Sequence, residues 1–279
     1  MRFGPVLGLL ALVLLAGCGG GGGDGPPVAV GTNGVPELAD AIANGRGFIA
    51  PAQRSVADRS SVVWIERDMS VRIRVAGDVL YTFGQPVTTV SNIETYQSAD
   101  GRGVLIKNAT GLGFGDRFDL NHTSFGVWAE SRGADLLQAE TADLIDGAPF
   151  YLVVPTPRSE MPTTGAALYR GAVLGVETDG REFQAFIVGA LDAEVDFLRG
   201  TMSATATLSE RDGTGWGTVD MPGILISGTA FSSDAVTASS GHRGTVEGVF
   251  AGPKAVELAG TLILEGETTV RASIAARQR

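Results

Sequence analysis

The chain of 279 residues has 21 basic and 31 acidic side chains, which give a formal net charge of −10. Nucleic-acid affinity depends on clustered cations, so this balance excludes a general phosphate-binding surface and we expect no nucleic-acid partner. Forty residues are glycine, yet 44% of the chain is apolar, which is enough for a folded core. One cysteine and two histidines exclude an intramolecular disulfide and leave few groups for metal or acid–base chemistry.

The N-terminus has the three-part pattern of a secretory signal peptide. Arg2 supplies a positive charge, an apolar run covers Val6 to Leu15, and the small residues Ala16 and Gly17 follow. The run is about 10 residues long, whereas a membrane-spanning helix needs about 20. We therefore expect residues 1–17 to be a cleaved signal peptide and not a permanent transmembrane helix.

The end of this signal, Leu15 to Cys18, resembles the bacterial lipobox. In that motif the cysteine thiol receives a diacylglyceryl group, and cleavage leaves the cysteine as the acylated first residue. The resemblance implies that Cys18 is the lipidation site and that its acyl chains anchor the protein in a membrane. Because residue 19 is Gly and not Asp, we expect delivery to the bacterial outer membrane.

The segment after Cys18 is predicted to be a tether. Gly19 to Pro36 is dominated by Gly, Pro and small residues, which end regular elements and offer little to pack. Such a segment has a root-mean-square span of about 25 Å. Glu37 to Ala43 has the composition of a short helix. We assign the lipidated cysteine and its Gly/Pro-rich tether to residues 18–44.

From about Phe48 onward the sequence predicts an all-β protein. Apolar stretches of about 5 to 8 residues are separated by Gly, Asn or Asp, and no window keeps a helical period. The strands expected in the first half are Ser61–Glu66, Val71–Val75, Val79–Phe83, Val87–Ile93, Gly103–Lys107 and Phe118–His122. Those expected in the second half are Phe125–Glu130, Phe150–Val154, Ala166–Val176, Phe183–Gly189, Val195–Phe197, Thr201–Leu208, Ile224–Phe231, Arg243–Phe250, Glu257–Glu265 and Thr268–Ile274.

Alternation in the second half predicts one buried and one solvated face. Apolar residues alternate with Thr and Ser over Thr201 to Leu208, and in Glu257 to Glu265 the leucines alternate with Glu257, Thr261 and Glu265. About eight of the strands are expected to close into a barrel, since closure removes exposed edges. Polar outer faces and an aromatic content of only 7% favour a water-facing barrel with a packed interior over a membrane-spanning one.

Five stretches in order resemble the barrel of surface lipoproteins related to transferrin-binding protein B. They cover about residues 125 to 275 and comprise Gly126–Glu130, Thr156 with Met161–Gly171, Val195–Phe197 with Gly200–Ser203, Ile226–Phe231 and Gly248–Thr261. The last stretch, GVFAGPKAVELAGT, is similar to the family signature, although Leu258-Ala259 replaces the commoner Val/Ile-Gly. The resemblance implies an eight-stranded antiparallel barrel over 124–279 and an irregular β handle over 45–123.

The same resemblance implies a non-enzymatic binding protein. Its expected partner is a protein, with a host protein or an iron or haem carrier as the candidates, and an outer-membrane receptor or surface-assembly protein as a further partner. Two alternatives stay open at this point. One is a carrier of a small apolar ligand such as haem, held in a handle pocket, and the other is a structural lipoprotein that faces the periplasm.

The sequence offers little catalytic chemistry. No nucleotide-binding, hydrolase or metalloprotease motif is present, and the segment Asp116 to His122 lacks the spacing of a calcium loop and is interpreted as a solvated turn. His242 is interpreted as an exposed residue at a hairpin tip. We therefore expect no catalytic residues, no metal site and no cofactor, and the ligand-binding residues stay unknown. The aromatic residues Trp128, Tyr169, Phe231 and Phe250 fall in strand patterns and are expected in the core.

Overall fold

The structure is a computed structural model that describes residues 38, 41, 48–49, 53–54, 60–65, 70–75, 78–90, 93–108, 120–131 and 142–279. The predicted signal, Cys18 and the predicted tether from Gly19 to Pro36 lie outside these residues. Of the expected short helix, Leu38 and Ala41 are described and both are helical. The rest of the described chain is almost entirely β-strand, which confirms the all-β prediction.

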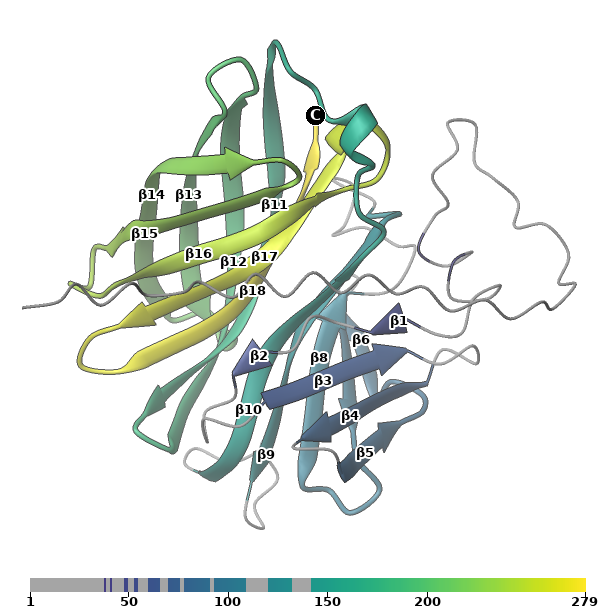
Figure 1. The fold of residues 1–279 in the computed structure, drawn as a ribbon. Helices are drawn as coiled ribbons and strands as arrows, with labels where there is room; N and C mark the ends of the chain where they lie inside the picture. Colours follow the sequence, from purple (N-terminus) through teal and green to yellow (C-terminus); the bar gives the residue numbers. More distant parts are fainter. Residues whose placement is uncertain are drawn as a thin grey trace, which may run out of the picture.

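Two sheets form the first part of the molecule (Figure 1). The first has five strands, β1 (Phe48–Ile49), β2 (Gln53–Arg54), β3 (Ser60–Ile65), β4 (Val71–Val75) and β5 (Asp78–Phe83). The second contains β6 (Thr88–Val90), β7 (Ile93–Gln97), β8 (Gly103–Asn108), β9 (Thr123–Ser131) and β10 (Ala142–Val153). Val63, Ile73 and Phe83 of the first sheet pack against Tyr96, Leu105, Trp128 and Phe150 of the second. We call this two-sheet sandwich the handle.

Eight consecutive strands form the second part. They are β11 (Ala166–Asp179), β12 (Glu182–Asp196), β13 (Thr201–Glu210), β14 (Gly215–Ser227), β15 (Ala230–Ala238), β16 (Arg243–Ala251), β17 (Glu257–Glu265) and β18 (Thr269–Gln278). Each pairs antiparallel with the next, and β18 also pairs with β11, so the sheet closes on itself. The prediction of an eight-stranded antiparallel barrel is confirmed.

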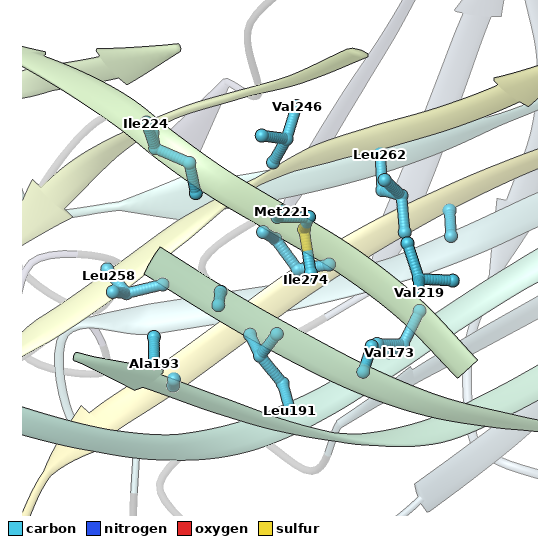
Figure 2. Close-up of a cluster of buried hydrophobic side chains, with 14 of the residues drawn as sticks. Val173, Leu191, Ala193, Val219, Met221, Ile224, Val246, Leu258, Leu262 and Ile274 are labelled. Atoms are coloured by element: carbon cyan, nitrogen blue, oxygen red, sulfur yellow. The ribbon is translucent and has the colours of Figure 1, made fainter. Parts of the chain in front are cut away.

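The barrel interior is filled with side chains (Figure 2). The predicted inward set Met202, Ala204, Ala206 and Leu208 is buried, while the alternating Ser203, Thr205 and Thr207 are exposed. Side chains from opposite walls, such as Met221 of β14 and Ile274 of β18, belong to this one core. Eight strands give an interior that side chains can fill, so the barrel has a solid core and not a ligand chamber.

One patch of the barrel's outer wall is also buried. The outward-facing Ala172, Leu174 and Val176 of β11 pack against Ile106, Phe125 and Val127 of the handle. The hydroxyl of Ser273 on β18 donates a hydrogen bond of 2.8 Å to the carbonyl oxygen of Gly126 on β9. The handle therefore lies directly against the barrel through a third apolar core.

Several predicted strand boundaries were wrong. Val87–Ile93 spans two separate strands, and Phe183–Gly189 and Val195–Phe197 belong largely to one long strand, β12. Ile224–Phe231 contains a turn in which Gly228 adopts a φ of 63°, a conformation that glycine permits without strain. Phe118–His122 is not a strand where it is described, because β9 begins at Thr123.

Strand pairing places β9 and β10 outside the closed ring. Both pair in the handle sheet, and β10 reaches the barrel only through a short pairing with β12. The division of the chain into a handle over 45–123 and a barrel domain over 124–279 stays a prediction. Among the described residues there is no helix with the length and hydrophobicity needed to cross a bilayer.

Candidate functional site

The two ends of the barrel carry different groups. At one end lie the C-terminus and the turn Pro253–Ala255, which belongs to the family-like signature (Figure 1). We call this the signature end. The hairpin between β17 and β18 lies at the other end, together with the turns around Gly180, Gly213 and Gly241. We call this the hairpin end, and we describe the two ends in turn.

The signature turn is held in a strained shape. Lys254 and Ala255 have φ angles of 53° and 60°, which non-glycine residues rarely adopt. The Tyr169 hydroxyl donates a hydrogen bond of 2.5 Å to the carbonyl oxygen of the fully buried Ala255. Gly252 precedes the turn at a φ of 70°, and a Cβ there would lie 2.4 Å from the His122 ring. The turn is thus fixed between the barrel core and His122, the residue before β9.

Glu257 follows this turn and joins the barrel to the handle. Its two carboxylate oxygens accept hydrogen bonds from the backbone N–H of Asn121 at 2.6 Å and of His122 at 3.0 Å. The side chain is buried, and burial raises its pKa to about 7, although the two N–H groups and nearby Arg277 favour the charged form. The interpretation of Glu257 as solvated was wrong, because the chain entering β9 covers this part of the wall.

His122 was also misplaced by the sequence. It was interpreted as part of a solvated turn, but it is buried, and its backbone N–H is bound to Glu257. Asp116 to Asp119, the acidic part of that segment, lie outside the described residues. The described part of the chain contains no cluster of three or more His, Cys, Asp or Glu side chains arranged to hold a metal ion.

A polar network closes the hairpin end. Glu177 Oε1 accepts hydrogen bonds from Trp216 Nε1 at 3.1 Å and from the Thr268 hydroxyl at 2.6 Å. His242 Nε2 lies 3.0 Å from the Thr268 oxygen, and its Nδ1 lies 2.9 Å from the Ser240 oxygen. His242 is buried beside the Trp216 ring, so its interpretation as an exposed loop residue was wrong. Hydrogen bonds thus connect five residues that come from four segments of the chain.

The order of these hydrogen bonds assigns the imidazole tautomer. Thr268 donates its only proton to Glu177, so it accepts from His242 Nε2–H, and Nδ1 then accepts from the Ser240 hydroxyl. A serine hydroxyl, an imidazole and a carboxylate are thus connected through a threonine. Ser240 lies at a hairpin tip, and the Gly241 N–H beside it is bound to the Ala238 carbonyl oxygen, so it is not free for an oxyanion. The network holds the hairpins at this end of the barrel together.

Replacing Glu177 tests this structural role. Because both bonds go to one oxygen, Glu177→Gln keeps the acceptor and is expected to lower the free energy of unfolding by less than about 1 kcal/mol. Glu177→Leu leaves the Trp216 N–H without its acceptor and is expected to lower it by about 1–3 kcal/mol. Urea unfolding followed by tryptophan fluorescence measures both variants. Equal losses for Gln and Leu would contradict the assigned network.

The handle contains a buried ion pair that the sequence did not indicate. Lys107 Nζ donates a hydrogen bond to Glu94 Oε2 at 2.5 Å and one to the Asn108 carbonyl oxygen at 3.0 Å. The Tyr96 hydroxyl donates to the same Glu94 oxygen, and Lys107 Nζ lies 5.3 Å from the Tyr96 ring centre. Burial lowers the pKa of Lys107, while the Glu94 carboxylate opposes that shift. One of the two lysines of the chain is therefore a buried structural group.

Three leucines are conspicuously exposed, and all belong to the signature end. Leu168 is the third residue of β11, Leu198 lies in the turn after β12, and Leu225 lies near the end of β14; they are 58%, 72% and 65% exposed. Large apolar side chains exposed around one end of a barrel are candidates for contact with a protein partner. We call these three residues the leucine rim. No sequence signal marked them, since leucines at strand positions are usually expected in the core.

The described residues form a closed, side-chain-filled barrel that carries exposed leucines at one end and a β handle on its outer wall. Residues 161–278 match the sequence family described as the C-lobe and N-lobe β-barrels of transferrin-binding protein B. The barrel of this chain matches that family, as the motifs of the sequence predicted. No curated protein matches the sequence.

Solved structures with a similar fold include three binding proteins. Intact Ap-TbpB, with N and C lobes, aligns with 79% of this chain and 52% of its own at 16% identity and a TM-score of 0.46. A mutant of transferrin-binding protein B from Haemophilus parasuis Hp5 aligns with 79% and 51% at 15% identity and a TM-score of 0.46. The N-lobe domain of lactoferrin-binding protein B from Moraxella bovis aligns with 59% and 77% at 15% identity and a TM-score of 0.39. The chain thus spans about half the length of the first two.

Proposed function

We propose that this protein is a lipid-anchored lipoprotein of the bacterial outer membrane, facing the cell exterior, that binds a protein partner and catalyses no reaction. The observation that supports this most is the filled barrel core, because it leaves recognition to outer surfaces. The leucine rim offers such a surface at the signature end. The match of the barrel to the transferrin-binding protein B family points to a protein ligand, and the names of the relatives suggest iron carriers.

The anchor and the orientation are tested on cells. With Cys18→Ala the protein is expected to leave the membrane fraction, whereas Ser203→Ala, an exposed change on the barrel wall, is expected to leave fractionation unchanged. Protease added to intact cells is expected to release fragments of the wild-type protein. Full protection of the protein on intact cells, with digestion after outer-membrane rupture, would support the periplasm-facing alternative instead.

The partner is tested by direct binding. Transferrin and lactoferrin, in iron-loaded and iron-free forms, are passed over the immobilised protein. If an iron carrier is the ligand, the double substitution Leu198→Glu with Leu225→Glu is expected to weaken binding by at least tenfold, since it places charges in an apolar contact. Thr237→Glu, an exposed position elsewhere on the barrel, serves as the matched control. Absence of binding to every form rejects an iron-carrier partner.

A further inference from the structure

A partly open cavity lies where the edge of the handle meets the barrel wall. It has a volume of about 290 Å³ and is lined on the handle side by Ile93, Ile106 and Val127 and on the barrel side by Leu174, Phe186 and Val188. We call this the junction cavity. The packed contacts of the third core lie directly beside it, since four of these residues belong to that core. Small-ligand sites occur preferentially at such junctions and are mostly apolar.

The junction cavity continues into a groove on the barrel wall. This groove has a volume of about 600 Å³, shares Ile93, Leu174 and Val188 with the cavity, and runs over the small residues Ala172 and Ala190. Those two alanines are outward-facing positions of β11 and β12, where a larger side chain would fill the groove. An elongated apolar molecule could therefore begin in the cavity and extend along the wall.

The cavity has one charged group. Arg211, in the turn after β13, has its Nη2 3.4 Å from the Thr95 hydroxyl oxygen, and its backbone N–H is bound to the Phe186 carbonyl oxygen at 2.8 Å. No described carboxylate forms an ion pair with Arg211. The neighbouring Asp212 accepts the Thr214 N–H at 2.8 Å. The Arg211 guanidinium thus lies at the cavity, and it has further N–H donors besides the one near Thr95.

We propose that the junction cavity binds a free fatty acid, with the carboxylate at Arg211 and the acyl chain in the apolar cavity and groove. Guanidinium donors match a carboxylate in geometry and charge. Each methylene group taken from water into the apolar lining strengthens binding by about fourfold. Arg211 is a single cation and therefore matches a ligand with one negative charge. The described lining of the cavity contains neither His nor Tyr, the residues that could bind haem iron there. This site is independent of the protein partner proposed above.

Laurate is the first probe. The experiment uses the chain from residue 19 onward, which contains every residue that the structure describes. Bound lipids are removed from this protein before titration calorimetry. One laurate is expected to bind per chain, while lauryl alcohol, with the same chain length and no charge, is expected to bind at least tenfold more weakly. Absence of laurate binding overturns the proposal, and equal affinity for laurate and lauryl alcohol overturns the role of Arg211.

Two variants locate the site. Arg211→Gln is expected to weaken laurate binding by about tenfold and to leave lauryl alcohol unchanged, because it removes one charge-assisted contact. Val188→Phe, which lines both cavity and groove, is expected to weaken both ligands by filling the space. The matched controls are Arg243→Gln and Thr237→Phe, exposed positions away from the cavity. Laurate binding that neither Arg211→Gln nor Val188→Phe weakens would place the ligand elsewhere and overturn the proposal.

Discussion

Replacing Phe250 by Ala is expected to lower the free energy of unfolding by about 3–5 kcal/mol. The ring is fully buried at the signature end of the barrel core, and its centre lies 6.1 Å from that of Tyr169, 5.9 Å from Phe197 and 5.7 Å from Phe231. Truncation removes the buried ring and also the edge and tilted contacts of three aromatic neighbours. These side chains come from different strands, so the surrounding sheet cannot collapse easily into the space.

The loss is measured by urea unfolding of the variant and the wild-type protein. Phe250→Leu keeps an apolar group of similar reach and is expected to lose about half as much stability or less. Thr237→Ala, at an exposed position on β15, is expected to change the free energy of unfolding by less than about 0.5 kcal/mol. A Phe250→Ala loss below about 1 kcal/mol would mean that the barrel core is not packed as described.

Replacing Glu257 by Gln is expected to remove a large pH dependence of stability. The pKa of Glu257 is about 7 in the folded chain and 4.5 as its ordinary value, so the folded state holds a proton that the unfolded state has lost between these values. Stability therefore falls as the pH rises from about 4.5 and stops falling above about 7. The shift corresponds to roughly 3 kcal/mol over this window.

Unfolding free energies measured at several values between pH 4.5 and pH 8 test this expectation. Other carboxyl groups also titrate in the wild-type protein, so the difference between wild type and Glu257→Gln isolates the contribution of this residue. Glu265→Gln, an exposed glutamate on the same strand, is the matched control and is expected to follow the wild-type curve. Parallel curves for wild type and Glu257→Gln would show that Glu257 does not titrate with a raised pKa.

Glu257 also gives the family signature a structural meaning. The strained turn at Lys254 and Ala255 directs the chain so that the next strand begins with a buried carboxylate facing the backbone of Asn121 and His122. The signature thus fixes how the handle joins the barrel.

The barrel was predictable because its signal is local and repeated. Alternation along β13 and β17 identified the inward leucines and alanines, and the glycine turns separated the strands. The aromatic residues Trp128, Tyr169, Phe231 and Phe250 were expected in the core and are buried there. The merged strand β12 was missed because Gly189 lies in the middle of a strand that closes a barrel, where glycine does not mark an end.

The polar groups that matter most were not predictable. Glu257 and Thr261 occupy outward positions, where alternation alone predicts solvent, yet the handle buries both. His242 stands near a glycine turn, and only the neighbouring hairpins bring Trp216, Thr268 and Glu177 around it. A periodic pattern describes which face of a strand a residue occupies, but it carries no information about what covers that face.

The amino-acid sequence by itself determined an all-β chain, an eight-stranded barrel with an apolar interior, the resemblance of that barrel to a known family, and the expectation of a lipid anchor at Cys18, because strand alternation, turn glycines and short motifs are local properties. Only the tertiary structure decided which part of the outer wall is buried, that the handle packs on that wall through a third core, and that Arg211 stands at an apolar cavity there. These features join residues more than a hundred positions apart, as Glu257 and Asn121 show. Their energetics depend on burial by distant segments, which exists only once the chain has folded.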